Sequence, residues 1–236
     1  MLDDLHNIAS GRCFILGSGP SLLDEQALPR LANETTIAVD SLAGWHELPF
    51  TPTYHILGDV NPREAMQWDR EDWDSEKFNI WYQDPALGHF RFVQRAPDHE
   101  GVFPYGMVGF DDTLPPIRSG RMSPLTVLQL GVWMGYREFY LLGCDMSSRG
   151  HCYNPDEHRV YELKWSHRVQ RNAVPIAQTL DGNGGSLTDC TLGGFLNITW
   201  GHNFTNKFSR YEHGYGNAAH WKEILPYKPL AEVLNA

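Results

Sequence analysis

Polar groups suited to nucleotide binding follow an apolar run near the start of the sequence. Gly17 and Gly19 come directly after the letters R-C-F-I-L, and glycines there allow a tight turn whose amide groups face an anion. Ser18 and Ser21 add hydroxyl donors to the same turn. Leu22 stands where the third glycine of G-x-G-x-x-G would be, so an ordinary turn at the end of a strand explains the letters equally well.

Three further apolar runs end in a carboxylate, at Asp40, Asp59 and Asp145. Open parallel sheets bind ligands beyond the carboxyl ends of their strands. Carboxylates at that edge could hold a ribose hydroxyl, a base amino group or Mg²⁺. Aspartate also begins loops and caps helices, but three of them at strand ends together favour a binding site.

Histidines gather in the second half of the chain, where His151, Cys152, His158 and His167 follow one another. Their spacing matches no standard zinc pattern, so we expect no zinc, and a solvated histidine-rich loop is the simpler interpretation. His167 differs from the others because it comes after the polar segment 146–161, at the start of a helical pattern. It could act as a general base near neutral pH.

The elements that must position these residues are short strands and a few helices. Apolar runs bounded by turn residues predict strands buried on both faces, at residues 12–16, 35–39, 53–57, 78–82, 138–142 and 187–190. Ser123 as N-cap and Pro124 in the first turn predict a buried helix that reaches Met134 and ends at Gly135. Helical spacing predicts another helix over 162–180, with Pro175 in its first turn or at a kink.

Strands that alternate with helices predict an α/β fold: a Rossmann-like, mostly parallel sheet flanked by helices, in one domain over 1–236. The polar segment 146–161 predicts a lid. The segment 68–118 is rich in aromatic residues, proline and aspartate, and we interpret it as an insertion over the site.

The formal net charge of −10 repels a phosphate backbone, so we expect no non-specific nucleic-acid binding. The four cysteines form no C-x-x-C, and residues 1–10 hold no apolar run, which together predict reduced thiols and a cytoplasmic protein. No stretch approaches the roughly 20 apolar residues of a membrane span, so we expect no transmembrane segment. A homo-oligomer is compatible with this composition.

The letters F-I-L-G-S-G-P-S-L at 14–22 resemble the opening motif of a Rossmann-like superfamily. It includes the small bacterial CMP-sialic acid sialyltransferases, the 6-hydroxymethylpterin diphosphokinase-like proteins and the flagellin-glycosylation proteins. The stretch 135–145, G-Y-R-E-F-Y-L-L-G-C-D, and the lid letters G-H-C-Y at 150–153 resemble later parts of the sialyltransferases. The resemblance covers most of 12–196 and matches 68–114 poorly.

The resemblance implies that Ser18, Asp40 and Asp59 line the nucleotide site, with Asn61 as a competing match for Asp59. The sialyltransferases have asparagine at the first three positions. Aspartates at the last two look more like the diphosphokinase-like branch and would favour a metal–nucleotide complex, so Asp40 and Asp59 are also the candidate ligands of a Mg²⁺ ion.

The resemblance also implies roles for residues later in the chain. Ser119 and Gly120 would touch the donor, Tyr153 would bind a phosphate oxygen, and His167 would be the catalytic base.

These observations lead us to expect a glycosyltransferase that moves a sugar from a nucleotide-sugar donor to a hydroxyl-bearing acceptor, a glycan or a small molecule. One alternative is a Mg²⁺-dependent diphosphokinase that acts on a pterin-like alcohol with ATP. A second alternative is a non-catalytic module that binds a nucleotide or a sugar.

Overall fold

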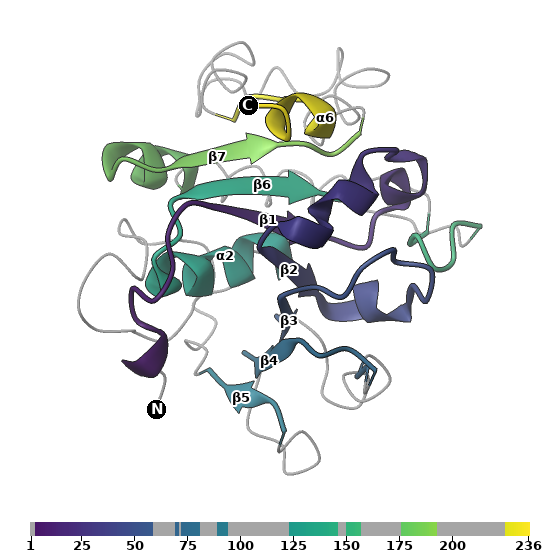
Figure 1. Ribbon diagram of the computed structural model, residues 1–236, viewed down its shortest axis with the longest axis horizontal. Helices are drawn as coiled ribbons and strands as arrows, with labels where there is room; N and C mark the ends of the chain where they lie inside the picture. The colour runs from purple at the N-terminus through teal and green to yellow at the C-terminus, as the bar shows by residue number, and fades with distance from the viewer. Residues whose placement is uncertain are drawn as a thin grey trace, which may run out of the picture.

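The computed structural model describes residues 3–58, 69–70, 72–80, 89–93, 123–145, 150–156, 176–192 and 225–236. Seven strands form one sheet in the order β5-β4-β3-β2-β1-β6-β7, and every neighbouring pair is parallel (Figure 1). The strands are β1 (Arg12–Leu16), β2 (Thr36–Val39), β3 (Tyr54–Leu57), β4 (Glu76–Asn79), β5 (Arg91–Phe92), β6 (Glu138–Leu142) and β7 (Ser186–Asp189). The predicted α/β, Rossmann-like class is confirmed.

The order of the strands places β1 in the middle of the sheet. From β1 the chain adds β2 to β5 on one side and then β6 and β7 on the other. The reversal between β1 and β6 is the topological switch point, where sheets of this class commonly bind ligands. The Gly17–Gly19 turn and the segment that carries Asp145 therefore leave the sheet side by side.

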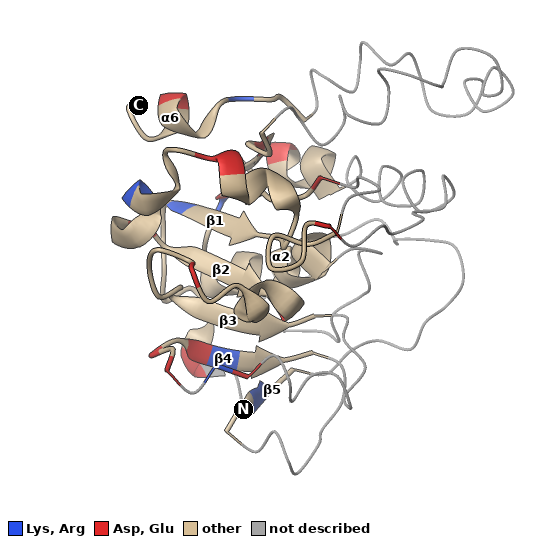
Figure 2. Cartoon of the chain, turned by 90° about the vertical axis from the view of Figure 1, so that its right-hand side faces the viewer, with Lys and Arg blue, Asp and Glu red and all other residues tan. Residues whose placement is uncertain are grey.

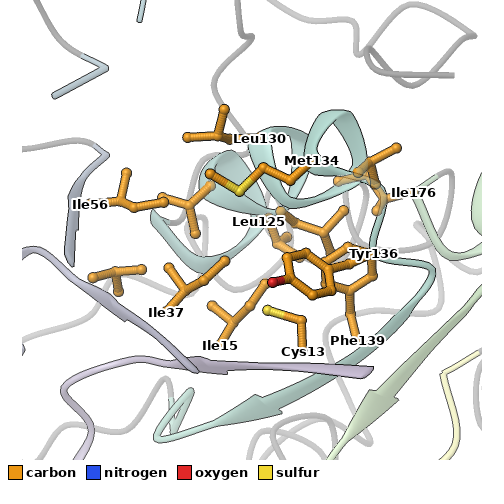
Figure 3. Close-up of a cluster of buried hydrophobic side chains, with 14 of the residues drawn as sticks. Cys13, Ile15, Ile37, Ile56, Leu125, Leu130, Met134, Tyr136, Phe139 and Ile176 are labelled. Atoms are coloured by element: carbon orange, nitrogen blue, oxygen red, sulfur yellow. The ribbon is translucent and has the colours of Figure 1, made fainter. Parts of the chain in front are cut away.

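Side chains of alternate strand residues build two cores, one on each face of the sheet. On one face Cys13, Ile15 and Ile37 pack against α2 (Ser123–Met134), as Figure 3 shows. All α2 residues from Pro124 onward are buried, as the sequence predicts. The helix ends at Gly135, whose φ of +111° is the left-handed conformation expected of a glycine stop.

The other face carries short 3-10 helices, where the sequence predicts no helices. They are η2 (Pro20–Asp24), η3 (Leu28–Asn33) and η4 (Asp40–Gly44), joined by the C-terminal helix α6 (Leu230–Val233); η1 (Asp3–Leu5) lies at the N-terminal end. Phe14, Leu16 and Leu142 point to this face and pack with residues of these elements. Both faces of the central strands are thus covered, which fits their uniformly apolar letters.

The described part of the 68–118 segment contributes two strands to the sheet. Residues 76–79 and 91–92 are β4 and β5, which extend the sheet. Residues 94–118 lie outside the described part, so an insertion over the site stays a prediction. The predicted strand at 78–82 starts two residues earlier than expected. Whereas β2 and β3 hold no charged residue, β4 carries Glu76 and Lys77 (Figure 2). The Glu76 carboxylate accepts a hydrogen bond from Arg91 of the edge strand β5, at 2.6 Å.

Two further predicted elements are described in part. Residues 176–182 are helical, so the second predicted helix runs two residues past its expected end, and 162–175 lie outside the described residues. The expected lid is described only at 150–156. Among the described helices, none has the length and apolar character needed to span a bilayer.

Candidate functional site

The loops that follow β1 and β6 are joined by backbone hydrogen bonds. The amide of Gly17 donates to the carbonyl of Leu142, and the amide of Gly19 donates to the carbonyl of Gly143, both at 2.8 Å. A Cβ atom on either Gly17 or Gly19 would come within 2.5 Å of the Gly143 oxygen. Glycine is therefore needed at both positions because a neighbouring backbone passes too close for any side chain.

The carboxylate of Asp145 completes this junction. Its oxygens accept hydrogen bonds from the Ser21 amide, at 3.2 and 3.3 Å, and from the Ser21 hydroxyl, at 2.8 Å. The amides of Gly17, Gly19 and Ser21 thus donate within the protein, and the expectation that the glycines leave theirs facing an anion is wrong. The sequence could not show this, because the acceptors lie at the end of β6 and in the loop after it, more than a hundred residues away.

Ser18 lies at the centre of a second polar group, on the side of β1 toward β2. Its hydroxyl shares a hydrogen bond with Nδ1 of His151 at 2.8 Å and another with the hydroxyl of Ser41 at 3.2 Å. Its carbonyl accepts the amide of Cys152 at 2.8 Å. The ring of Tyr153 stacks on that of His151, with centroids 4.9 Å apart. Ser18, Ser41, His151 and Tyr153 are called the serine–histidine cluster below.

Asp40 ties the end of β2 to the end of β3. Its φ of +44° lies in the left-handed region, which aspartate enters more readily than most residues. Its carboxylate accepts the amide of Gly58 at 2.7 Å, and its carbonyl accepts a hydrogen bond from Nε2 of His55 at 3.2 Å. Hydrogen bonds from His55 and from the Gly58 amide thus fix the turn that places Ser41 next to Ser18.

His55 is fully buried on β3 and faces the rings of Trp73 and Phe90 edge-on. A carbonyl can only accept, so the ring proton lies on Nε2 and Nδ1 is an acceptor. Within the described part of the chain Nδ1 has no hydrogen-bond partner. Burial lowers the pKa of His55 to about 4, so the ring is neutral at physiological pH.

The first turn of α2 lies beside the end of β3. A Cβ on Gly58 would lie 3.0 Å from Cγ1 of Val127 and 3.5 Å from Cβ of Ser123. The positive end of a helix dipole therefore lies next to the loop that Asp40 holds, and it favours negative charge there.

The structure brings some of the predicted site residues together and leaves others undescribed. Ser18 and Tyr153 both contact His151, and Asp40 directly precedes Ser41. Gly17, Gly19, Ser21 and Asp145 lie at the same edge, where they join the loops after β1 and β6. Asp59, Asn61, Ser119, Gly120 and His167 lie outside the described residues, so their roles stay predictions.

Three residues of this edge were not predicted as site residues: Ser41, His55 and His151. The spacing around His151 suggested only a zinc ligand or part of a solvated loop. The other two carried weak signals that could have been used. Ser41 directly follows a candidate aspartate, and His55 is a histidine inside an otherwise apolar run.

Among the ranges that the structure describes, no three His, Cys, Asp or Glu side chains gather as the ligands of one metal ion would. The proposed Mg²⁺ site pairs Asp40 with Asp59, and the second residue is not described. All four cysteines are buried as free thiols. Burial raises the pKa of Cys152 and of Cys190 to about 12, so these side chains are protonated and poorly nucleophilic.

The serine–histidine cluster can therefore offer hydroxyl and imidazole groups to an anion at the carboxyl edge of the central strands. Comparison of the chain with protein-family models, with curated proteins and with solved structures gives no match.

Proposed function

We propose that this protein is a transferase that uses a nucleotide-activated sugar, and that the serine–histidine cluster binds the phosphates of that donor. One observation carries the proposal: groups from the loop after β1, the loop after β2 and the 150–156 segment meet at Ser18. They do so where parallel sheets bind ligands. Gly58, whose amide donates to the Asp40 carboxylate, lies beside the first turn of α2, whose dipole favours negative charge there.

The chemistry of the cluster suits a departing phosphate. Hydroxyls and an imidazole donate hydrogen bonds to phosphate oxygens, and such bonds stabilise the charge that grows on the leaving nucleotide. The amides of Gly17, Gly19 and Ser21 already donate to acceptors within the protein. Side chains would therefore donate the hydrogen bonds to the phosphate oxygens. His167, which lies outside the described residues, is the base that we propose for the acceptor hydroxyl.

The resemblance stated above supports the same placement, since it assigns Ser18 to the nucleotide site and Tyr153 to a phosphate oxygen. His151 lies between them, sharing a hydrogen bond with one and stacking on the other. The segment 150–156 would then close over the donor and exclude water, so that hydrolysis does not compete with transfer.

The first test is thermal unfolding in the presence of CMP-, UDP-, GDP- and dTDP-sugars and of ATP, each with and without Mg²⁺. A donor at about a hundred times its dissociation constant stabilises the folded state by about 2.7 kcal/mol. For a chain of this size we expect an increase in Tm of roughly 5–10 °C with one nucleotide sugar. An increase with ATP only, and only with Mg²⁺, would point instead to the diphosphokinase.

Variants localise the effect. Ser18→Ala and Tyr153→Phe should each remove most of the donor-induced shift, because each deletes one hydroxyl from the cluster. Ser186→Ala is the matched control, since this serine is exposed at the start of β7, at the opposite edge of the sheet. No shift with any donor, or equal shifts in all three variants, contradicts the proposal. Loss of transfer but not of binding in His167→Ala would separate an enzyme from a binding module.

A further inference from the structure

Two energetically costly features lie next to each other, one directly after β2 and one within β3. Asp40 has a left-handed backbone, one of two such non-glycine residues in the described part of the chain. His55 is fully buried, yet its Nδ1 has no partner among the described residues. A leucine or phenylalanine at position 55 would avoid the second cost, and strain of both kinds is typical of functional sites.

A single hydrogen bond joins the two features. Nε2 of His55 donates to the carbonyl of Asp40 at 3.2 Å, and the Asp40 carboxylate accepts the Gly58 amide at 2.7 Å. β3 thus holds Asp40 by its backbone and by its side chain. The next residue, Ser41, reaches the hydroxyl of Ser18, which in turn contacts His151.

We propose that His55 is a positioning residue of the donor site: it holds Asp40 in its left-handed conformation and so places the Ser41 hydroxyl against Ser18. The placement of Ser41 is a statement about the protein without ligand. Its consequence for donor binding rests on the function proposed above.

The competing interpretation is that His55 only fills space between Trp73 and Phe90. Three variants separate the two. His55→Gln places an amide donor near the position of Nε2, His55→Asn places one nearer to Nδ1, and His55→Phe keeps a ring without a donor. Tyr54→Phe is the control, because it removes a buried hydroxyl contact with Tyr136 from the same strand on the opposite face.

The first measurement needs no ligand. In ¹⁵N-labelled protein the amide resonances of Ser18 and Ser41 should move in His55→Phe and His55→Asn. They should stay at their wild-type positions in His55→Gln and in Tyr54→Phe. In the wild type the imidazole ¹⁵N spectrum at pH 7 should show a protonated Nε2 and an unprotonated Nδ1.

The second measurement is affinity for the nucleotide sugar that gives the largest thermal shift. Loss of one buried hydrogen bond corresponds to about a tenfold change, so we expect the dissociation constant to rise about tenfold in His55→Asn and His55→Phe. His55→Gln should restore affinity to within about threefold of wild type. In turnover assays KM for the donor should rise while kcat changes little.

Two outcomes overturn the proposal: unmoved Ser18 and Ser41 resonances in folded His55→Asn, or resonances in His55→Gln that match those in His55→Asn. If His55→Phe fails to fold, the Gln and Asn variants decide alone, since both are polar and differ in the position of the donor. If no nucleotide binds the wild type, the proposed function fails, while the resonances still decide the role of His55.

Discussion

The glycines of the β1 turn differ from other glycines in the space around them. A Cβ on Gly19 would lie 1.7 Å from Oδ2 of Asp145 and 2.5 Å from the Gly143 oxygen, whereas a Cβ on Gly182 would meet nothing within 4 Å. Because a contact with backbone cannot be relieved by a rotamer change, we expect Gly19→Ala to destabilise the fold by about 2–3 kcal/mol.

Gly182→Ala, in the helical residues 176–182, is the matched control. It should leave stability unchanged or raise it by up to about 1 kcal/mol, since alanine is the better helix former. Urea unfolding of both variants measures the difference. Equal midpoints would mean that the loops after β1 and β6 can separate at little cost.

His55 also predicts how stability depends on pH. Its pKa is about 4 in the folded protein and about 6.5 when exposed, so the unfolded chain takes up the proton first as the pH falls. Above pH 6.5 the neutral ring makes its full contribution to the free energy of unfolding. As the pH falls from 6.5 toward 4, this free energy decreases by about 3 kcal/mol in total.

The check is urea unfolding between pH 7 and pH 4 for the wild type and His55→Gln, which does not titrate in this range. The variant should lose about 3 kcal/mol less than the wild type over the interval. Parallel curves for the two proteins would show that His55 is solvated.

At the scale of single residues, the sequence indicates part of the candidate site. Ser18 and Asp40 lie at the expected edge, because serine and aspartate directly after apolar runs carry a chemical signal. Tyr153 was expected there only from the resemblance. The acceptors of the Gly17 and Gly19 amides were not predictable, since Leu142 and Gly143 become neighbours only when β6 pairs with β1.

Helix α6 shows how an element outside the sheet is attached to it. Arg12 at the start of β1 donates to both carboxylate oxygens of Glu34, at 2.9 and 2.6 Å, and to the carbonyl of Val233 at 3.0 Å. Leu230 and Val233 are buried in the core that Phe14 and Leu16 share. One arginine therefore joins β1, the end of η3 and the C-terminal helix.

We expect Arg12→Met to destabilise the protein by about 1–2 kcal/mol, because it removes three charge-assisted hydrogen bonds from a half-buried position. Arg30→Met is the control: Arg30 is exposed and bonds only to the chain end that follows α6 in the described structure. Its effect should stay below about 0.5 kcal/mol. Chemical unfolding compares the two, and equal losses would mean that Glu34 adds nothing.

The predictability of an element follows from its length and pattern. β1, β2, β3, β6 and β7 were found within one residue, because apolar runs between turn residues carry a strong signal. β5 has two residues, and η2, η3 and η4 have five or six, too few for any periodicity to show. These short helices cover one face of the sheet, and α2 covers the other. Of the two coverings, only α2 was predictable from the sequence.

At the scale of the whole molecule, the class of the fold was predictable and the neighbours in the sheet were not. Runs buried on both faces imply parallel strands covered on two sides. The sequence of β1 does not indicate that its second neighbour, besides β2, is β6. The net charge of −10 likewise belongs to the whole chain and does not locate the site.

The central place of β1 has a consequence for how the protein is made. Its two partners are β2, which begins about 20 residues after β1 ends, and β6, which begins about 120 residues after it. At 5–20 residues per second the ribosome needs roughly 6–25 s to synthesise that stretch. For this time one side of β1 is an apolar strand edge without its native partner, the kind of surface that pairs with other nascent chains. We therefore expect the risk of aggregation during synthesis to be greatest between the synthesis of β1 and that of β6.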